Sequence, residues 1–393
     1  MSLLSLIEEA RSRHLAAPDV APERPKVRLD ESGQGTAELV APVDAGPGDF
    51  DALLAELLPE VPVSVLDVTE VRAWGNREDA RKYVRCRIAR RPDGGETGRE
   101  LLARIPRRRG RKRPAAVTGG VSLLVPVADP QVGKAYEWGG GTAETIERFR
   151  SVTDQLHGKV RALRRAGSPV EEIVVVNMGD TTEGCMGHYS HQPFTIDCNE
   201  SDQMAVATDL YDDLIDTCAE LAPQVRCTVV NSNHDQPRSS SGKNLTDPGD
   251  SRAFTIWRDL ARAYGKAPER YGHVAFEVPS DPLVATLTVQ GLGVAAVHGH
   301  QATKGQTPIL KLWNWWDGQC AGRLPAGDCD ILLGGHYHHF ATMRQQGRLA
   351  ALCPTLDGGS QWLTDKDGVW SEPGLLTVVV GSGGVGALEV LEP

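Results

Sequence analysis

Five short polar clusters stand directly after apolar, strand-like runs in the second part of the chain. Each cluster combines Asp, Asn, Gln or His, which supply oxygen and nitrogen ligands to divalent cations. In chain order they are Asp129-Pro130-Gln131, Gly179-Asp180, Asn233-His234-Asp235, His298-Gly299-His300 and Gly335-His336-Tyr337-His338. A lone Asp after a strand is usually a helix cap or a turn residue. Five such clusters in one chain instead predict a shared functional site.

The runs that precede the clusters are typical of buried strands. They cover residues 121–128, 171–178, 225–232, 292–297 and 330–335. Apolar residues at helical spacing predict helices over 142–166, 204–221 and 251–264, and residues 375–391 are typical of closing strands. Strands that alternate with helices indicate a layered α/β domain, and a two-sheet sandwich fits because helices become scarce toward the C-terminus. Ligands at the carboxyl ends of neighbouring strands converge on one crevice, so we expect the five clusters to meet.

The order D-x-[H/Q], G-D, N-H-[D/E], H-G-H and G-H-x-H resembles the calcineurin-like metallophosphoesterase superfamily. The resemblance runs from about Val121 to the C-terminus and is not specific to one substrate. The long insertions and the separate N-terminal segment are similar to uncharacterised metallophosphoesterases of actinobacterial phages. The resemblance implies a four-layer α/β/β/α sandwich over residues 121–393.

The resemblance also implies which residues bind metal. Two divalent ions are expected, with one residue bridging them. The first ion would be held by Asp129, Gln131 and His338, the second by Asn233, His298 and His336, and Asp180 would bridge both. Either histidine of the H-G-H cluster is able to coordinate, and His298 is favoured.

The remaining site residues are expected to act on the substrate. His234 would sit near a substrate oxygen as a proton donor, and Asp235 would orient His234. His300 would contact the substrate or support the ligands. Arg238 and Lys243 lie in the Ser- and Gly-containing segment 236–250, which would either reach phosphate or form a plain surface loop.

The chemistry of such a site follows from its ligands. A phosphoester is an anion and repels hydroxide, so two divalent cations about 3.5–4 Å apart would bind its oxygens and acidify a water. His234 can relieve charge on the leaving oxygen as a general acid. Mixed oxygen and nitrogen ligands suit Mn²⁺, Mg²⁺, Fe or Zn²⁺. Gln131 stands where the superfamily usually has His, and its neutral oxygen favours Mn²⁺ or Mg²⁺ and a weaker first position.

Two insertions carry residues that are able to line the site. Residues 181–194 hold His188, Tyr189 and His191, which we expect on the surface or in a lid rather than on a metal. Trp313, Trp315 and Trp316 cannot all face one side of a helix; some belong to a core, and one is able to stack on a nucleobase.

The first third of the chain carries no such clusters. We expect an N-terminal helix and a mobile segment over residues 1–50, a small β-containing module over 51–95 with a turn at Gly75-Asn76, and a basic linker over 96–120. Seven basic residues lie between Arg104 and Arg113. They are either a solvated linker or an arm that meets nucleic-acid phosphates through counterion release.

Composition narrows the class of protein. The chain has 393 residues, 40% of them hydrophobic and 24% charged, which is ordinary for a globular protein. The net charge of -10 argues against general nucleic-acid binding. No apolar stretch approaches the ~20 residues that span a bilayer. The first 15 residues lack a signal-peptide cleavage site, and eight cysteines form no C-x-x-C pair, so we expect a cytoplasmic protein (host cytoplasm if phage-encoded) without membrane contact.

The leading functional prediction is a metal-dependent hydrolase of phosphomonoesters or phosphodiesters, with a nuclease of the DNA-repair type as one form. One alternative is a non-catalytic phosphoesterase-like scaffold for protein binding, which would require lost ligands. Another is a nucleic-acid-binding protein with its binding module in the N-terminal third, where no zinc-finger, helix-turn-helix or RNA-recognition signature occurs. The oligomeric state is not indicated.

Overall fold

The computed structural model describes most of the chain from residue 96 onward and four strands before it. The described ranges are 26–29, 35–42, 66–74, 81–90, 96–105, 113–135, 140–188, 192, 195–239, 242–359 and 371–393. The chain divides into two compact units, Met1–Gly95 and Glu96–Pro393, and each is described by itself. In the described ranges, no helix combines the length and the apolar character needed to cross a lipid bilayer.

The first unit contains one antiparallel sheet with the strand order β1-β2-β4-β3. Its strands are β1 (Lys26–Leu29), β2 (Gly35–Pro42), β3 (Leu66–Trp74) and β4 (Arg81–Arg90). β3 and β4 pair on either side of the predicted Gly75-Asn76 turn. β1 and β2 fall in the segment predicted to be mobile, so that prediction was wrong for these residues. β2 pairs with β4 along its whole length, which satisfies its main-chain hydrogen bonds. The predicted helices at the N-terminus and at 51–58 lie outside the described residues.

The second unit begins with α3 (Gly98–Ala103), inside the segment predicted to be a linker. Thr97 caps this helix: its hydroxyl accepts a hydrogen bond from the Glu100 main-chain N, and the Glu100 carboxylate accepts one from the Thr97 main-chain N at 2.8 Å. Leu101 is buried in the main core of the unit. The linker prediction was therefore wrong at its beginning, because a capped and packed helix occupies it.

A six-stranded sheet forms the centre of the second unit, with the order β15-β14-β5-β6-β7-β8. Four of its strands are parallel, namely β5 (Val121–Val127), β6 (Val170–Asn177), β7 (Gln224–Val229) and β8 (Val274–Glu277). β14 (Leu375–Gly381) runs antiparallel to β5, and β15 (Gly384–Leu391) pairs antiparallel with β14. The parallel order places the carboxyl ends of β5, β6 and β7 at one edge.

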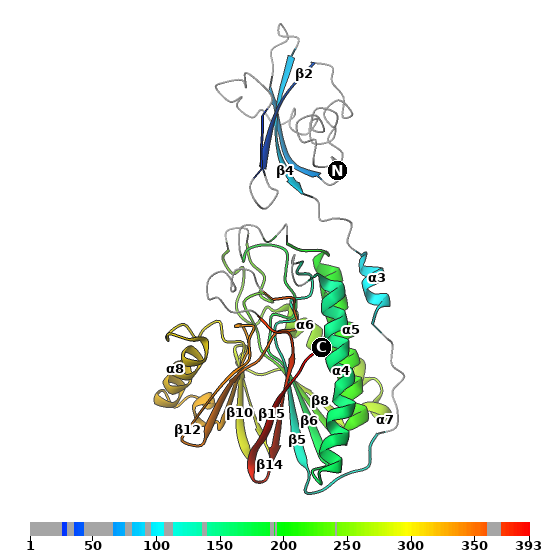
Figure 1. Ribbon diagram of the computed structural model, residues 1–393, viewed down its shortest axis with the longest axis vertical. Coiled ribbons are helices and arrows are strands. Elements are labelled where there is room, and N and C mark those ends of the chain that lie inside the picture. Colours follow the sequence, from blue (N-terminus) through cyan, green and yellow to red (C-terminus); the bar gives the residue numbers. More distant parts are fainter. Residues whose placement is uncertain are drawn as a thin grey trace. The chain divides into compact units, whose positions relative to one another are not determined.

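Helices cover one face of this sheet (Figure 1). They are α4 (Thr142–Arg165), α5 (Glu200–Leu221), α6 (Arg252–Gly265) and the short α7 (Pro268–Tyr271). The first three match the predicted helices to within a few residues. Phe149, Tyr211 and Trp257 are fully buried and meet edge to face, which anchors α4, α5 and α6 in one core.

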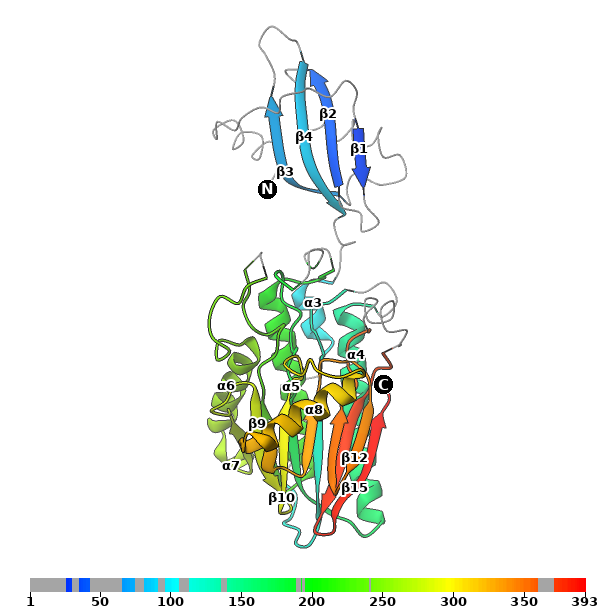
Figure 2. The ribbon, with the colours of Figure 1, turned by 90° about the vertical axis from the view of Figure 1, so that its left-hand side faces the viewer.

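A five-stranded sheet lies on the other side, with the order β12-β13-β11-β10-β9. Its strands are β9 (Val284–Val289), β10 (Leu292–Val297), β11 (Ile331–Gly334), β12 (Ala341–Gln345) and β13 (Arg348–Leu352). α8 (Pro308–Ala321) crosses its outer face in Figure 2, followed by the 3-10 helix η3 (Pro325–Asp328). Trp313 and Trp316 are buried in this outer core, and the Trp316 Nε1 donates to the Ala326 oxygen at 2.7 Å. Both indoles are therefore core residues and not open platforms for a nucleobase.

Side-chain alternation along the strands fixes the order of the layers. On β6, Ile173 and Val175 pack toward the helices, whereas Val174 and Val176 pack into a second core shared with the five-stranded sheet. On β10, Ala296 faces that shared core and Val297 faces α8. The unit is thus an α/β/β/α sandwich, and the predicted fold class is confirmed.

Candidate metal centre

The five polar clusters lie where the strands end, and their backbone is strained there. Five residues have a positive φ, although non-glycine residues rarely adopt it. They are Asp129 (52°), Gln131 (39°), Asp180 (48°), His336 (71°) and His338 (55°). Each such conformation costs of order 1–3 kcal/mol and persists where the surroundings enforce it, commonly at functional sites. The strain therefore marks the ends of β5, β6 and β11 as a candidate site.

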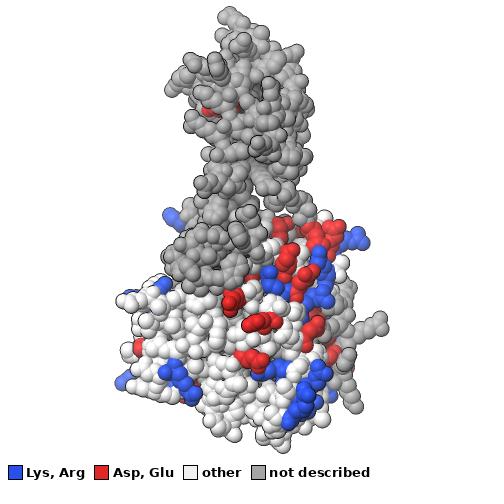
Figure 3. All heavy atoms as spheres, viewed as in Figure 1, with Lys and Arg blue, Asp and Glu red and all other residues white. Residues whose placement is uncertain are grey.

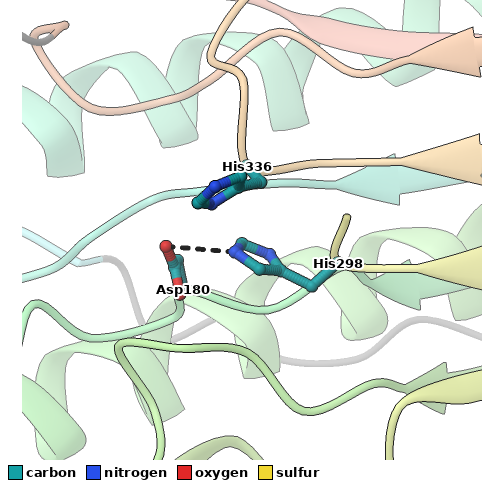
Figure 4. Close-up of side chains that lie close together, drawn as sticks. All are labelled: Asp180, His298 and His336. Carbon is teal, nitrogen blue, oxygen red and sulfur yellow. Dashed lines mark ion pairs between the residues drawn. The ribbon is translucent and has the colours of Figure 1, made fainter. Parts of the chain in front are cut away.

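Asp180, His298 and His336 form the tightest cluster of potential ligands. One carboxylate oxygen and one ring nitrogen from each histidine all lie within 4.8 Å of one another, and Figure 4 shows both rings beside the Asp180 carboxylate. The Nε2 of His298 lies 3.2 Å from the Asp180 Oδ2 and 3.0 Å from the Asn233 Oδ1. Its Nδ1 donates to the Met178 oxygen at 2.9 Å, so Nε2 is the nitrogen left to bind a ligand.

This cluster contains more acceptors than donors. The Asp180 and Asn233 oxygens both point at the His298 Nε2, which must carry a proton or share a cation with them. Burial opposes protonation of His298, but the Asp180 carboxylate outweighs burial and raises the pKa. A divalent cation would satisfy all three atoms, so the residues fit a metal.

Asp129 and His338 form a second pair beside the first cluster. The His338 Nε2 lies 3.4 Å from the Asp129 Oδ1, which has no hydrogen bond although it is buried. The other Asp129 oxygen accepts from the His336 main-chain N at 2.9 Å and ties β5 to β11. Burial opposes protonation of His338, but Asp357 and Asp129 outweigh it and raise its pKa to about 10. This pair also fits a cation.

Gln131 lies at the same edge and contacts a lysine. The Lys134 Nζ donates to the Gln131 Oε1 at 2.7 Å and also forms an ion pair with the buried Asp357 carboxylate. The Asp357 Oδ1 accepts from the Thr355 hydroxyl and lies 3.5 Å from the His338 Nδ1. Burial favours the neutral acid, but Lys134 and His338 outweigh it and lower the pKa of Asp357. The sequence motifs did not predict a role in the site for Lys134 or Asp357. Asp357 lies in the loop after β13, so it is a further polar residue that follows the end of a strand, like the residues of the five clusters.

His234 lies next to Asp180 and is held by Glu183. Its main-chain N donates to the Asp180 Oδ1 at 2.9 Å, and its Nδ1 donates to the Glu183 main-chain oxygen at 3.0 Å. Its ring stacks on His188 with the centroids 4.0 Å apart. Burial opposes protonation, but Glu183 and Asp180 raise the pKa of His234 to about 9. His188 is a half-buried neighbour of the site, whereas Tyr189 and His191 lie outside the described residues.

Asp235 differs from its expected role. Its carboxylate accepts from the main-chain N of Thr181 at 3.0 Å, from that of Thr182 at 3.2 Å and from the Ser232 hydroxyl at 2.8 Å. It therefore joins the loop after β6 to the loop after β7. The residue that contacts the His234 ring is Glu183, which the sequence analysis did not single out.

His300, Arg238 and Lys243, which were expected to contact the substrate, differ in their burial and their surroundings. The His300 ring lies 5.4 Å from that of His298, and burial together with His298 lowers its pKa to about 4. Arg238 is half-buried, and its backbone forms an isolated antiparallel β-bridge with Asn244. After burial and the neighbouring histidines, its positive charge is a further cause that lowers the pKa values of His188 and His300. Lys243 is exposed on the same loop, with its main-chain N bonded to the Ser239 hydroxyl. Arg238 is thus a half-buried residue of this loop, and Lys243 lies on the surface.

The ends of the basic segment are engaged within the second unit. Arg104 pairs with Glu96 and Glu147, and the Arg113 guanidinium donates twice to the Pro223 oxygen. Residues 106–112 lie outside the described residues. On the face seen in Figure 3, acidic and basic side chains are interspersed along the right of the view. Nucleic-acid binding through 104–113 stays a prediction.

The chain was compared with known proteins. No family model and no curated protein matches it. It is similar to the structure of Vps29 complexed with Zn²⁺ from Entamoeba histolytica, at 11% identity and a TM-score of 0.33, covering 68% of this chain and 96% of that one. It is also similar to a predicted phosphoesterase from Streptococcus pneumoniae, at 10% identity and a TM-score of 0.29, covering 70% and 99%.

A hypothetical protein from Pyrococcus horikoshii is similar at 9% identity and a TM-score of 0.33, covering 69% of this chain and 88% of that one. The sheet orders and layers define an α/β/β/α sandwich, which is the fold that the sequence motifs imply through their resemblance to metallophosphoesterases. The likeness to actinobacterial phage proteins stays a prediction.

Proposed function

We propose that this protein is a phosphoesterase that depends on two divalent cations. The observation that supports this most directly is the convergence of the buried Asp180 and His298 with the half-buried His336 from the ends of three strands. Burying several acceptors together is unfavourable unless protons or cations lie between them. The same edge holds Asp129 and His338 in a second arrangement of that kind.

The ligand sets follow from the motifs and are compatible with the distances. Asp129 and His338, with Gln131 by the sequence pattern, belong to the first position, and Asn233, His298 and His336 belong to the second. By the sequence pattern Asp180 would bridge the two positions. Its Oδ2 faces His298, and its Oδ1 accepts from the His234 main-chain N. Oxygen and nitrogen ligands without thiolates suit Mn²⁺ and Mg²⁺, with Fe and Zn²⁺ as alternatives.

The chain's own residues supply the rest of the chemistry. When bound, a pair of divalent cations neutralises a phosphoester and acidifies the attacking water. His234, with its raised pKa, carries a proton at neutral pH and donates it from Nε2 to the leaving oxygen, because Nδ1 is held by Glu183. Arg238, a half-buried cation on the loop that follows His234, would bind a phosphoryl oxygen.

The proposed substrate is a phosphomonoester or a phosphodiester. A nuclease of the DNA-repair type is one form of this proposal, and its supporting feature is the basic segment around Arg107–Arg109. The alternative is a phosphoesterase-like scaffold that binds a partner without turnover. Because both share the same fold, only hydrolysis distinguishes them.

The test is hydrolysis of bis-p-nitrophenyl phosphate and p-nitrophenyl phosphate by metal-stripped protein after addition of Mn²⁺, Mg²⁺ or Zn²⁺. We expect turnover that Asp180→Asn and His234→Ala abolish. Asp317→Asn, an exposed carboxylate on α8, is the matched control and retains activity. A folded, metal-loaded protein that cleaves neither ester would favour the scaffold.

A further inference from the structure

A lysine ammonium contacts Gln131, one of the residues expected at the first metal position. The Lys134 side chain is 13% exposed, and its Nζ donates to the Gln131 Oε1 at 2.7 Å. The same ammonium forms an ion pair with Asp357, which is 2% exposed. Two buried partners therefore hold this cation in place, unlike a surface lysine that samples many rotamers.

The contact with Gln131 conflicts with a metal at the same oxygen. Gln131 is the neutral ligand of the first position, and an amide oxygen that binds an ammonium has less charge to give to a second cation. A divalent ion on this oxygen would also lie within a few ångström of the ammonium, and two cations repel each other strongly where water is excluded. The Gln131 Oε1 therefore cannot accept from Lys134 and bind a divalent ion at the same time without weakening the binding of that ion.

The rest of the first position remains suited to metal. The Asp129 Oδ1 is buried without a hydrogen bond, 3.4 Å from the His338 Nε2. Asp357 binds Lys134 on one side and faces the His338 Nδ1 on the other, so Lys134 also fixes the residue that orients His338. The second position has a more complete set of ligands. The His298 Nε2 lies 3.2 Å from the Asp180 Oδ2 and 3.0 Å from the Asn233 Oδ1.

We propose that Lys134 withdraws Gln131 from the first metal position, so that this position binds a divalent cation through Asp129, His338 and Asp180 and more weakly than the second. This inference rests on the proposed use of the site for metal. One ion stays with the protein at low free metal, and the other exchanges.

The test is a Mn²⁺ titration of the metal-free full-length chain, followed by equilibrium dialysis and by electron paramagnetic resonance. We expect one Mn²⁺ with a mononuclear spectrum first. A second Mn²⁺ enters only at about tenfold or higher free metal, a gap of roughly 1.4 kcal/mol, with a coupled spectrum. Lys134→Met removes the competing charge and narrows the gap by about tenfold.

Two further variants control the result. Lys159→Met removes another mostly buried, ion-paired lysine on α4, and we expect it to leave both affinities unchanged. Gln131→Asn suits the positive φ but is too short to reach a metal. If Lys134 already holds Gln131 away from the metal, this variant leaves the weaker Mn²⁺ affinity unchanged, and a clear loss of that affinity would overturn the inference. This second variant keeps the proposal testable if Lys134→Met does not fold.

The outcomes separate this inference from the proposed function. Two ions of equal affinity in the natural chain and in Lys134→Met would overturn the inference, and hydrolysis would still support a phosphoesterase. One tight and one weak ion, with a gap that Lys134→Met narrows, would support the inference, and the absence of hydrolysis would then count against the proposed function. A gap that Lys134→Met leaves unchanged would overturn the inference. A chain that binds no Mn²⁺ would overturn both.

Discussion

The His234 Nδ1 lies 3.0 Å from the main-chain oxygen of Glu183 and 3.3 Å from its Oε2, so one residue holds the imidazole through two oxygens. Glu183 is fully buried. A carboxylate in that position stabilises the imidazolium, and the pKa of His234 is raised to about 9. Glu183 thus fixes both the orientation and the charge of the proposed proton donor.

Glu183→Gln tests this relationship through the pH dependence of kcat. The amide keeps the shape but loses the charge, so the imidazolium loses its proton at a lower pH. Since the Glu183 charge raises the pKa of His234, we expect the alkaline limb of the profile to lie at lower pH in Glu183→Gln than in the natural chain. We also expect kcat to fall by about 10- to 100-fold, as for other lost orienting partners. Glu389→Gln, an exposed carboxylate on β15, is the control. An unchanged alkaline limb in Glu183→Gln would argue against this role.

Asp235→Asn separates a structural role from a catalytic one. The Asp235 carboxylate accepts from two main-chain N–H groups and from Ser232, and an amide cannot accept from all of them. Buried donors left unpaired cost ~1–3 kcal/mol each, so we expect the free energy of unfolding of the metal-free protein to fall by about 2–4 kcal/mol. Urea unfolding measures this, with Asp317→Asn expected to change it by less than ~0.5 kcal/mol. Lost activity at unchanged stability would instead restore the expected orientation of His234 by Asp235.

The sequence predicted the strands and the polar ends of those strands, because burial on both faces gives continuous apolar runs and the motifs stand directly after them. It did not identify Glu183, Lys134 or Asp357. Their contacts depend on how three loops fold over one edge, and residue spacing does not encode this. Strands β1 and β2 were missed because Pro, Gly and Asp dominate the segment around them. They are strands because β2 pairs with β4 and β1 pairs with β2.

Metal binding should release protons. The pKa of His338 is raised to about 10 in the metal-free site, so His338 holds a proton at pH 7, and the pKa of His298 is raised as well. Imidazole must be neutral to bind a metal, so the proton leaves on binding and affinity rises with pH up to about 10. Calorimetric titration with Mn²⁺ in two buffers of different ionisation enthalpy should report the release of about one proton from His338. Equal heats in both buffers would contradict this.

Gly179 positions Asp180, and its replacement should remove metal binding. Gly179 has a φ of 88°, and a Cβ there would lie 2.5 Å from the Ser232 Cβ and 3.2 Å from the His298 Nδ1. Gly179→Ala must therefore push the loop that carries Asp180 away from His298. Gly167→Ala is a matched control, since Gly167 has a φ of 80° and open space around it.

In both variants an alanine must adopt the left-handed conformation, which lowers the free energy of unfolding by roughly 1–2 kcal/mol. Thermal unfolding measures this loss. Only Gly179→Ala meets the additional contact, so we expect Mn²⁺ binding to be lost in Gly179→Ala and kept in Gly167→Ala. If Gly179→Ala bound Mn²⁺ as the natural chain does, the Asp180 carboxylate would not depend on this turn for its position, and the proposed bridging role would lose its structural basis.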